Sequence, residues 1–157
     1  MAIEIERKFL LKNDSWRNKT QPVFISQGYL HIAKDLVIRV RTVADKSFLS
    51  LKGTAGGIRR LEFEYRIPMS DAVQLLEKFS IKPPIEKNRY YIEVSGFKWE
   101  IDEFLGVNTG LILAEIELKH ERQQFPIPEW LGAEVTGDIR YYNAYLAKNP
   151  YQNWSPK

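Results

Sequence analysis

Apolar and charged residues alternate along most of this chain, with the two-residue period of a half-buried β-strand. The clearest case is R-L-E-F-E-Y-R-I at residues 60–67, where every second position is apolar. The breaks between segments of this kind are mostly short, so we expect antiparallel hairpins or a meander. The pattern predicts eight strands, over about 2–11, 22–32, 36–43, 46–53, 58–67, 86–95, 97–104 and 111–119.

Two further segments, one near the middle of the chain and one near its start, have a helical pattern. Residues 71–79 follow Ser70, a residue type that can cap a first turn, and they present an apolar face. A shorter helical piece is expected to begin at Asp14.

The C-terminal segment predicts a third helix, over about residues 136–148, with Thr136 as its cap. Ile139, Tyr142 and Leu146 recur at helical spacing and form a stripe suited to packing on strands. Residues 150–157 are expected to form a loose tail.

The charged faces of the strands leave two geometries open. An open sheet or sandwich would bury the apolar faces and leave the charges in water. A closed barrel would turn the charges inward and pack its apolar outside under helices or a partner subunit, which would make a homodimer. The barrel is favoured because acids and bases are segregated by strand, as in the Glu4 and Glu6 pair and the Arg39 and Arg41 pair.

The segregation of charge also indicates a ligand. Neighbouring carboxylates raise one another's pKa unless a cation lies between them, so paired Glu residues suggest a divalent metal ion. Segregated Arg and Lys residues suggest a multiply charged anion by the same reasoning.

Composition narrows the classes of function. The 157 residues suit one domain, and the absence of cysteine excludes disulfide and thiolate chemistry. With only His31 and His120, a His-rich zinc site is not expected. The net charge of +3, from 23 basic and 20 acidic residues, does not indicate a nucleic-acid partner. Without a leader pattern or a membrane-spanning apolar run, we expect a cytoplasmic protein with no membrane contact.

Several motifs then occur in the order of a known family. E-I-E-R-K at residues 4–8 resembles the Glu-x-Glu-x-Lys signature of the CYTH superfamily, also called the triphosphate tunnel metalloenzymes. V-I-R-V-R, L-S-L-K-G, R-L-E-F-E, K-N-R and A-E-I-E-L-K follow in the family's order and spacing, over about residues 2–119. The ending V-T-G-D-I-R-Y-Y-N-A-Y-L-A is similar to the C-terminal helix of the family's short bacterial members, the tripolyphosphatase type.

The resemblance implies a mainly β (α+β) fold and a single CYTH-type tunnel domain over residues 1–157. This would be an eight-stranded antiparallel β-barrel with a few peripheral helices and a C-terminal helix. We expect that helix to plug one end of the barrel; the alternative is an amphipathic helix that only covers the strands. The resemblance also implies that the lumen binds a small-molecule linear triphosphate together with one or two Mg²⁺ or Mn²⁺ ions.

The resemblance also assigns roles to individual side chains. The implied metal-binding carboxylates are Glu4, Glu6, Glu62, Glu64, Glu115 and Glu117. The implied phosphate-binding residues are Lys8, Tyr29, Arg39, Arg41, Lys52, Lys87 and Arg89. Glu6, Lys8, Arg41 and Lys87 are the predicted catalytic residues, and Glu100 and Asp102 are predicted to support them.

The predicted function is metal-dependent hydrolysis of inorganic tripolyphosphate. The stretch around Lys52, L-S-L-K-G-T-A-G-G, lacks the aromatic platform expected beside a thiamine ring, and the chain is short. The alternatives are nucleoside triphosphatase, adenylyl cyclase, thiamine triphosphatase or RNA triphosphatase activity of the same superfamily, or a non-catalytic module that binds polyphosphate. Because the chain keeps both its acids and its bases, we expect an enzyme.

Overall fold

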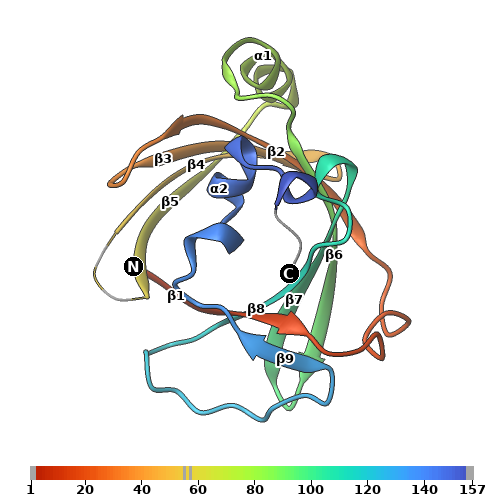
Figure 1. Ribbon diagram of the computed structural model, residues 1–157. Helices are drawn as coiled ribbons and strands as arrows, with labels where there is room; N and C mark the ends of the chain where they lie inside the picture. Colours follow the sequence, from red (N-terminus) through yellow and green to blue (C-terminus); the bar gives the residue numbers. More distant parts are fainter. Residues whose placement is uncertain (1–2, 55, 57, 155–157) are drawn as a thin grey trace.

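Eight antiparallel strands close into a ring, which is seen nearly end-on in Figure 1. The computed structural model describes residues 3–54, 56 and 58–154. Around the ring the order is β1, β5, β4, β3, β2, β6, β7 and β8, which returns to β1. The predicted eight-stranded antiparallel β-barrel is therefore confirmed. The strands are β1 (Ile3–Leu11), β2 (Val23–Ile32), β3 (Val37–Val43), β4 (Lys46–Thr54), β5 (Arg59–Ile67), β6 (Ile85–Val94), β7 (Phe97–Phe104) and β8 (Ile112–Glu117).

Strand β1 holds the barrel closed because it pairs with three other strands. Residues 3–5 pair with β5 and residues 6–9 pair with β8. Beyond the barrel, Phe9 and Leu11 pair with a ninth strand, β9 (Leu131–Glu134), which the sequence pattern did not predict. A β-carbon at Gly132 would lie 2.8 Å from the carbonyl oxygen of Leu10, so this close approach of the two strands requires glycine.

Helix α1 (Met69–Phe79) lies outside the barrel and packs across β2, β3 and β4 (Figure 1). A β-carbon at Gly28 would lie 2.6 Å from Leu76 Cδ2, so the missing side chain lets the helix approach β2. Ser70 was predicted to cap this helix, but it does not. Pro68 holds that position in extended backbone, and Ser70 lies inside the first turn.

The turn after β1 also differs from the prediction. Residues 14–20 form turns rather than the helical piece expected from Asp14. Trp16 is fully buried in the main apolar cluster and donates a hydrogen bond from Nε1 to the carbonyl oxygen of Asn13, 2.9 Å away. Burying this ring bends the chain tightly, which is incompatible with a continuing helix.

The C-terminal segment is helical but broken. A 3₁₀ turn, η2 (Ile139–Tyr141), precedes α2 (Asn143–Lys148), so the single helix predicted over about 136–148 is shorter than expected. Thr136 does not cap it: Thr136 Oγ1 accepts a hydrogen bond from the backbone N–H of Lys8, 2.9 Å away. Asp138 caps η2 by accepting from the N–H of Arg140, 3.1 Å away.

This break changes which side chains are buried. Ile139 is 62% exposed, Tyr142 faces the lumen and Leu146 is 1% exposed, so the predicted packing stripe does not exist. The predicted loose tail is also wrong for its first part. Residues 151–153 form a third 3₁₀ turn, η3 (Tyr151–Asn153), after η1 (Gly106–Asn108) and η2 in the described residues, and the Trp154 ring lies edge-on to Tyr151 with 4.9 Å between centroids. Residues 155–157 lie outside the described part of the chain.

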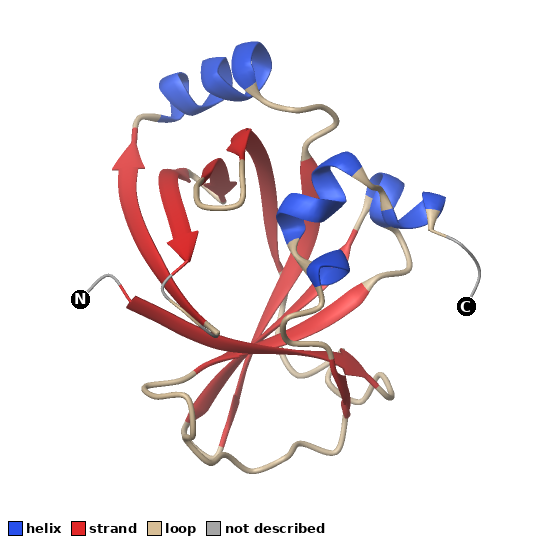
Figure 2. Ribbon diagram, turned by 60° about the vertical axis from the view of Figure 1, so that its left-hand side comes forward, coloured by secondary structure: helices blue, strands red, loops and turns tan. Residues whose placement is uncertain are grey.

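The apolar core lies outside the ring and at one of its ends rather than in its middle. The larger cluster covers the outer face of β1, β6, β7 and β8 beneath the segment 118–134, and Trp16, Trp99 and Trp130 are its largest members. A second cluster joins Tyr141 and Leu146 to Tyr29 and its neighbours. Figures 1 and 2 together place the C-terminal helical segments over one end of the barrel. None of the helices in the described residues is long and apolar enough to span a lipid bilayer.

Candidate active site in the barrel lumen

A cavity of about 1060 Å³ occupies the lumen. Because side chains two apart on a strand share a face, most strands send a set of charged side chains inward. All of the predicted site residues line this cavity except Asp102, which lies beneath it and is 1% exposed. The sequence pattern therefore placed these side chains correctly, while their individual roles stay predictions.

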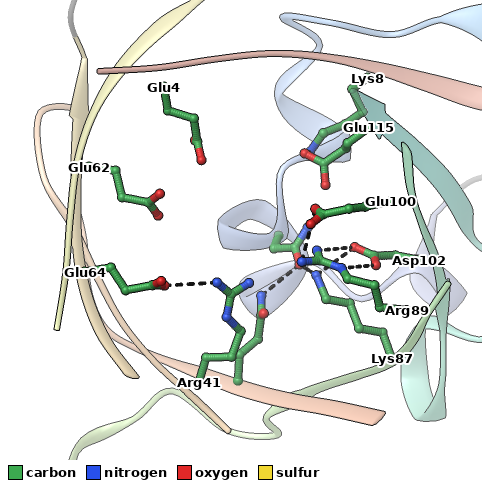
Figure 3. A network of polar contacts seen from close by, with 12 residues as sticks. Glu4, Lys8, Arg41, Glu62, Glu64, Lys87, Arg89, Glu100, Asp102 and Glu115 are labelled. Atoms are coloured by element: carbon green, nitrogen blue, oxygen red, sulfur yellow. Dashed lines mark hydrogen bonds and ion pairs between the residues drawn. The ribbon is translucent and has the colours of Figure 1, made fainter. Parts of the chain in front are cut away.

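One wall consists of β3, β4 and β5, with β1 beside them. Arg41 Nη2 lies 3.1 Å from Glu64 Oε2, and Arg39 Nη2 lies 3.4 Å from Glu62 Oε2. Lys52 Nζ lies 2.9 Å from Glu4 Oε1. Figure 3 shows Glu4, Glu62 and Glu64 pointing inward from this side.

The facing wall consists of β6, β7 and β8 and is more deeply buried. Arg89 makes two parallel hydrogen bonds to the Asp102 carboxylate, at 2.7 and 2.9 Å, and Lys87 Nζ lies 2.9 Å from the same carboxylate (Figure 3). Burial would raise the pKa of Asp102, but Arg89 and Lys87 hold it well below its ordinary range. Burial lowers the pKa of Lys87 to about 8, although Asp102 opposes the shift.

Glu6 and Glu115 form an acid pair between β1 and β8. Burial first, and then Glu115, raises the pKa of Glu6 well above its ordinary value. Burial would do the same for Glu115, but Lys8, 3.8 Å away, helps to lower its pKa to about 2. Glu115 is therefore the stronger acid of this pair.

This donor set fits a divalent metal ion. The pKa values of Glu4 and Glu117 are also raised, by burial and by neighbouring acids, so carboxylates outnumber the cations available to them beside β1 and β8. Hard carboxylate oxygens suit Mg²⁺ or Mn²⁺, and a bound ion would relieve the repulsion. Among the described residues, no three acidic or histidine side chains already converge as a metal site.

The basic side chains also have unused hydrogen-bonding capacity. The Nε–H groups of Arg39 and Arg41 are buried and lack a hydrogen-bond partner among the described residues. Burial, and then Arg39 and Arg89, lowers the pKa of Arg41, which shows how closely the cations are gathered. Such a group favours a multiply charged anion, because an anion both pairs the donors and separates the like charges.

The structure adds residues that sequence reasoning missed. Ser50 donates to Glu64 at 3.1 Å, and Gln27 Nε2 lies 2.8 Å from Asn143 Oδ1. Ser50 and Gln27 are each two positions from a predicted residue, so strand alternation could have found them. Tyr142 and Asn143 reach the lumen from the broken C-terminal segment, where no alternation exists.

A closed barrel with this lumen defines a class of protein that encloses a polyanion between opposed rows of cations and carboxylates. A model of the CYTH domain matches residues 2–146. The chain belongs to the CYTH family, as the motifs had indicated.

Two relatives and one solved structure are similar over nearly the whole chain. An inorganic triphosphatase of Acetivibrio thermocellus is 50% identical over 154 residues, which cover 98% of this chain and 99% of that protein. An inorganic triphosphatase of Nitrosomonas europaea is 36% identical over 148 residues, covering 92% and 96%. A crystal structure of an inorganic triphosphatase superposes with a TM-score of 0.67 at 32% identity, covering 98% of this chain and 99% of that one.

Proposed function

We propose that this protein is a metal-dependent inorganic triphosphatase that hydrolyses tripolyphosphate inside its barrel. The observation that carries the proposal is the lumen itself, where cations from β3, β4 and β6 and Lys8 of β1 face a single cavity. The 50% identity to an inorganic triphosphatase supports the same substrate.

The cations are arranged to hold a chain of phosphates. Arg39, Arg41 and Lys52 lie on one wall and Lys87 and Arg89 on the other, so an extended anion between them meets positive charge along its length. Arg offers a planar fork to phosphate oxygens and Lys a compact charge. Tyr29 is 3% exposed beside them and presents its hydroxyl to the same space.

Catalysis in such a site is chiefly positioning and charge stabilisation. Lys8, Arg41 and Lys87 would stabilise the charge that develops on the transferred phosphoryl group and its leaving group. Arg89 and Asp102 hold Lys87 in place from below, because the same carboxylate contacts both cations. Glu100, 3.2 Å from Arg89, adds to this support.

The carboxylates would hold the metal. Glu4, Glu6, Glu115 and Glu117 lie along β1 and β8, and Glu62 on β5 lies beside Glu4. Glu64 contributes least, since its Oε2 already receives Arg41 and Ser50. A bound Mg²⁺ or Mn²⁺ supplies neutralisation of phosphate oxygens and polarisation of the attacking water. Metal dependence is general among CYTH triphosphatases.

Phosphate release from tripolyphosphate tests this proposal. Purified protein should release phosphate with Mg²⁺ or Mn²⁺ and lose that activity in excess chelator, because the paired carboxylates then lack their counter-charge. Equal turnover in chelator would contradict metal dependence. The same assay with ATP, thiamine triphosphate and pyrophosphate tests the substrate, and faster turnover of ATP would favour the nucleoside triphosphatase alternative. Tight tripolyphosphate binding without turnover of any substrate would favour the binding module.

Three further expectations accompany this function as predictions. They are a cytoplasmic location, a small-molecule substrate with no nucleic-acid or membrane partner, and a homodimer as one state of assembly. The outer face of β5 leaves Leu61, Phe63 and Tyr65 between 39% and 56% exposed, which is compatible with a second subunit.

A further inference from the structure

The side chain of Asn143 lies at the closed end of the cavity, between two buried polar residues. Asn143 is the first residue of α2 and lines the lumen. Its Oδ1 accepts hydrogen bonds from Lys87 Nζ and from Gln27 Nε2, each 2.8 Å away. Lys87 is 2% exposed and Gln27 is fully buried, so both donors are fixed.

These contacts settle the orientation of the amide. A lysine ammonium carries only donors, so the atom that faces Lys87 must be the oxygen. With Oδ1 receiving two donors, its lone pairs are used, and Nδ2 with its two N–H groups points away from them. Among the described residues, none accepts a hydrogen bond from Nδ2.

The neighbouring backbone is held just as firmly. Lys8 Nζ donates to the carbonyl oxygen of Tyr141 at 2.9 Å and lies 5.2 Å from the centre of the Tyr142 ring. The segment 141–143 is thus attached to two lumen cations, one from β1 and one from β6. Its position relative to a bound phosphate chain is set by the barrel.

We propose that Asn143 is a substrate-binding residue, whose Nδ2 donates a hydrogen bond to an oxygen of the terminal phosphate of a linear triphosphate beside Lys87. The inference rests on the proposed function and adds a neutral donor from the C-terminal segment to the cations of the strands. A hydrogen bond between a neutral donor and a charged acceptor contributes roughly a tenfold change in affinity or more.

A double-mutant cycle separates this role from one exerted through Lys87. Tripolyphosphate binding is measured by calorimetry in excess chelator, which prevents turnover, for the wild type, Asn143→Ala, Lys87→Met and the double variant. Asn143→Ala should weaken binding about tenfold in both backgrounds, because its own contact is lost in each. An effect that disappears in the Lys87→Met background would mean that Asn143 only orients Lys87, and would overturn the proposal.

Asn143→Asp gives an independent measurement. It keeps an oxygen acceptor for Lys87 and Gln27, so a purely structural role would survive with an unchanged melting temperature. It replaces the donor that faces the lumen by a carboxylate oxygen, so tripolyphosphate binding should weaken by more than in Asn143→Ala. Binding equal to the wild type in Asn143→Asp would overturn the proposal even if Asn143→Ala failed to fold.

Asn149→Ala is the matched control. Asn149 ends the same helix, donates from Nδ2 to the carbonyl oxygen of Tyr145 and does not line the cavity. It should bind tripolyphosphate as the wild type does, and equal weakening there would assign the effect to the helix and overturn the role of Asn143. A wild type that neither binds tripolyphosphate nor releases phosphate from it with Mg²⁺ or Mn²⁺ would instead reject the proposed function itself.

Discussion

Arg41 illustrates how single residues in the lumen are held against their electrostatic preference. Its guanidinium is buried near Arg39 and Arg89, which lower its pKa, and Glu64 at 3.1 Å offsets them only in part. Gathering like charges costs free energy that an anion can recover on binding. We therefore expect Arg41 to contribute to anion binding far more than to folding.

Replacing Arg41 by Ala should separate these two contributions. The substitution removes a charge-assisted fork from a phosphate, and should cost about 2–5 kcal/mol of substrate or transition-state stabilisation in a desolvated site. The free energy of unfolding should hardly change, because the crowding of cations is relieved. Kinetics with tripolyphosphate and urea unfolding measure the two quantities.

Arg66→Ala is the control. Arg66 lies two positions after the lumen residue Glu64 on β5, but it is exposed and does not line the cavity. Its kinetics should match the wild type. Unfolding of Arg41→Ala, with normal catalysis by its folded fraction, would show instead that Arg41 belongs to a structural ion-pair lattice.

Which residues could be predicted from sequence depended on their local backbone. On strands, alternation fixes the side that each residue faces, so Arg41, Lys87 and Glu115 were placed in the lumen without coordinates. Asn143 and Tyr142 were not predicted as lumen residues because the chain changes direction between the 3₁₀ turn η2 and the helix α2, so no single period describes where their side chains point. Alternation places Asp102 on the lumen face of β7. It is nevertheless buried beneath Lys87 and Arg89, and a periodic pattern cannot predict that burial.

At the scale of elements, the eight barrel strands were predictable because each has six or more residues and most of them alternate between apolar and polar positions. Strand β9 has only four residues, L-G-A-E, and exists because Gly132 allows it to approach β1. The C-terminal helix was predicted too long for a related reason. Its first turn is fixed by tertiary contacts, with Thr136 held to β1 and Tyr141 buried in the second apolar cluster.

Because the chain breaks between η2 and α2, we predict different losses of stability for substitutions at two positions that an unbroken helix would bury on one face. Leu146→Ala should lower the free energy of unfolding by about 2–5 kcal/mol, because Leu146 is buried at the closed end of the barrel. Ile139→Ala should change it by less than about 0.5 kcal/mol, because Ile139 is 62% exposed. Urea unfolding of both variants tests this, and equal losses would indicate one continuous packed helix.

The whole molecule is organised with its charges inside and its apolar core outside. The outer face of β1, β6, β7 and β8 is covered by turns and by the segment 118–134 rather than by helices, and Phe125 lies edge-on to Trp99 there. The larger apolar cluster therefore lies outside the lumen, whose strands send charged side chains inward. Its walls are held by ion pairs, and the buried Asp102 carboxylate accepts two hydrogen bonds from Arg89.

This pair makes the stability of the whole molecule depend on pH. Arg89 and Lys87 depress the pKa of Asp102 in the folded state, so as pH falls the unfolded chain takes up the proton first. The stabilisation is therefore complete above the unfolded pKa of about 3.9 and is lost at about 1.4 kcal/mol per pH unit below it.

Asp102→Asn should reveal this dependence in urea unfolding measured between pH 7 and pH 2.5. At pH 7 the variant should be less stable by about 3–5 kcal/mol, because Arg89 and Lys87 are left buried without their counter-charge. The difference from the wild type should shrink as pH falls below about 4, where only the wild type loses a stabilising charge. Asp138→Asn removes the same type of pair at the surface, with Arg140, and should change the free energy of unfolding far less because water screens that pair. A difference between wild type and Asp102→Asn that is as large at pH 2.5 as at pH 7 would show that the carboxylate stabilises the barrel by packing and hydrogen bonding, independently of its charge.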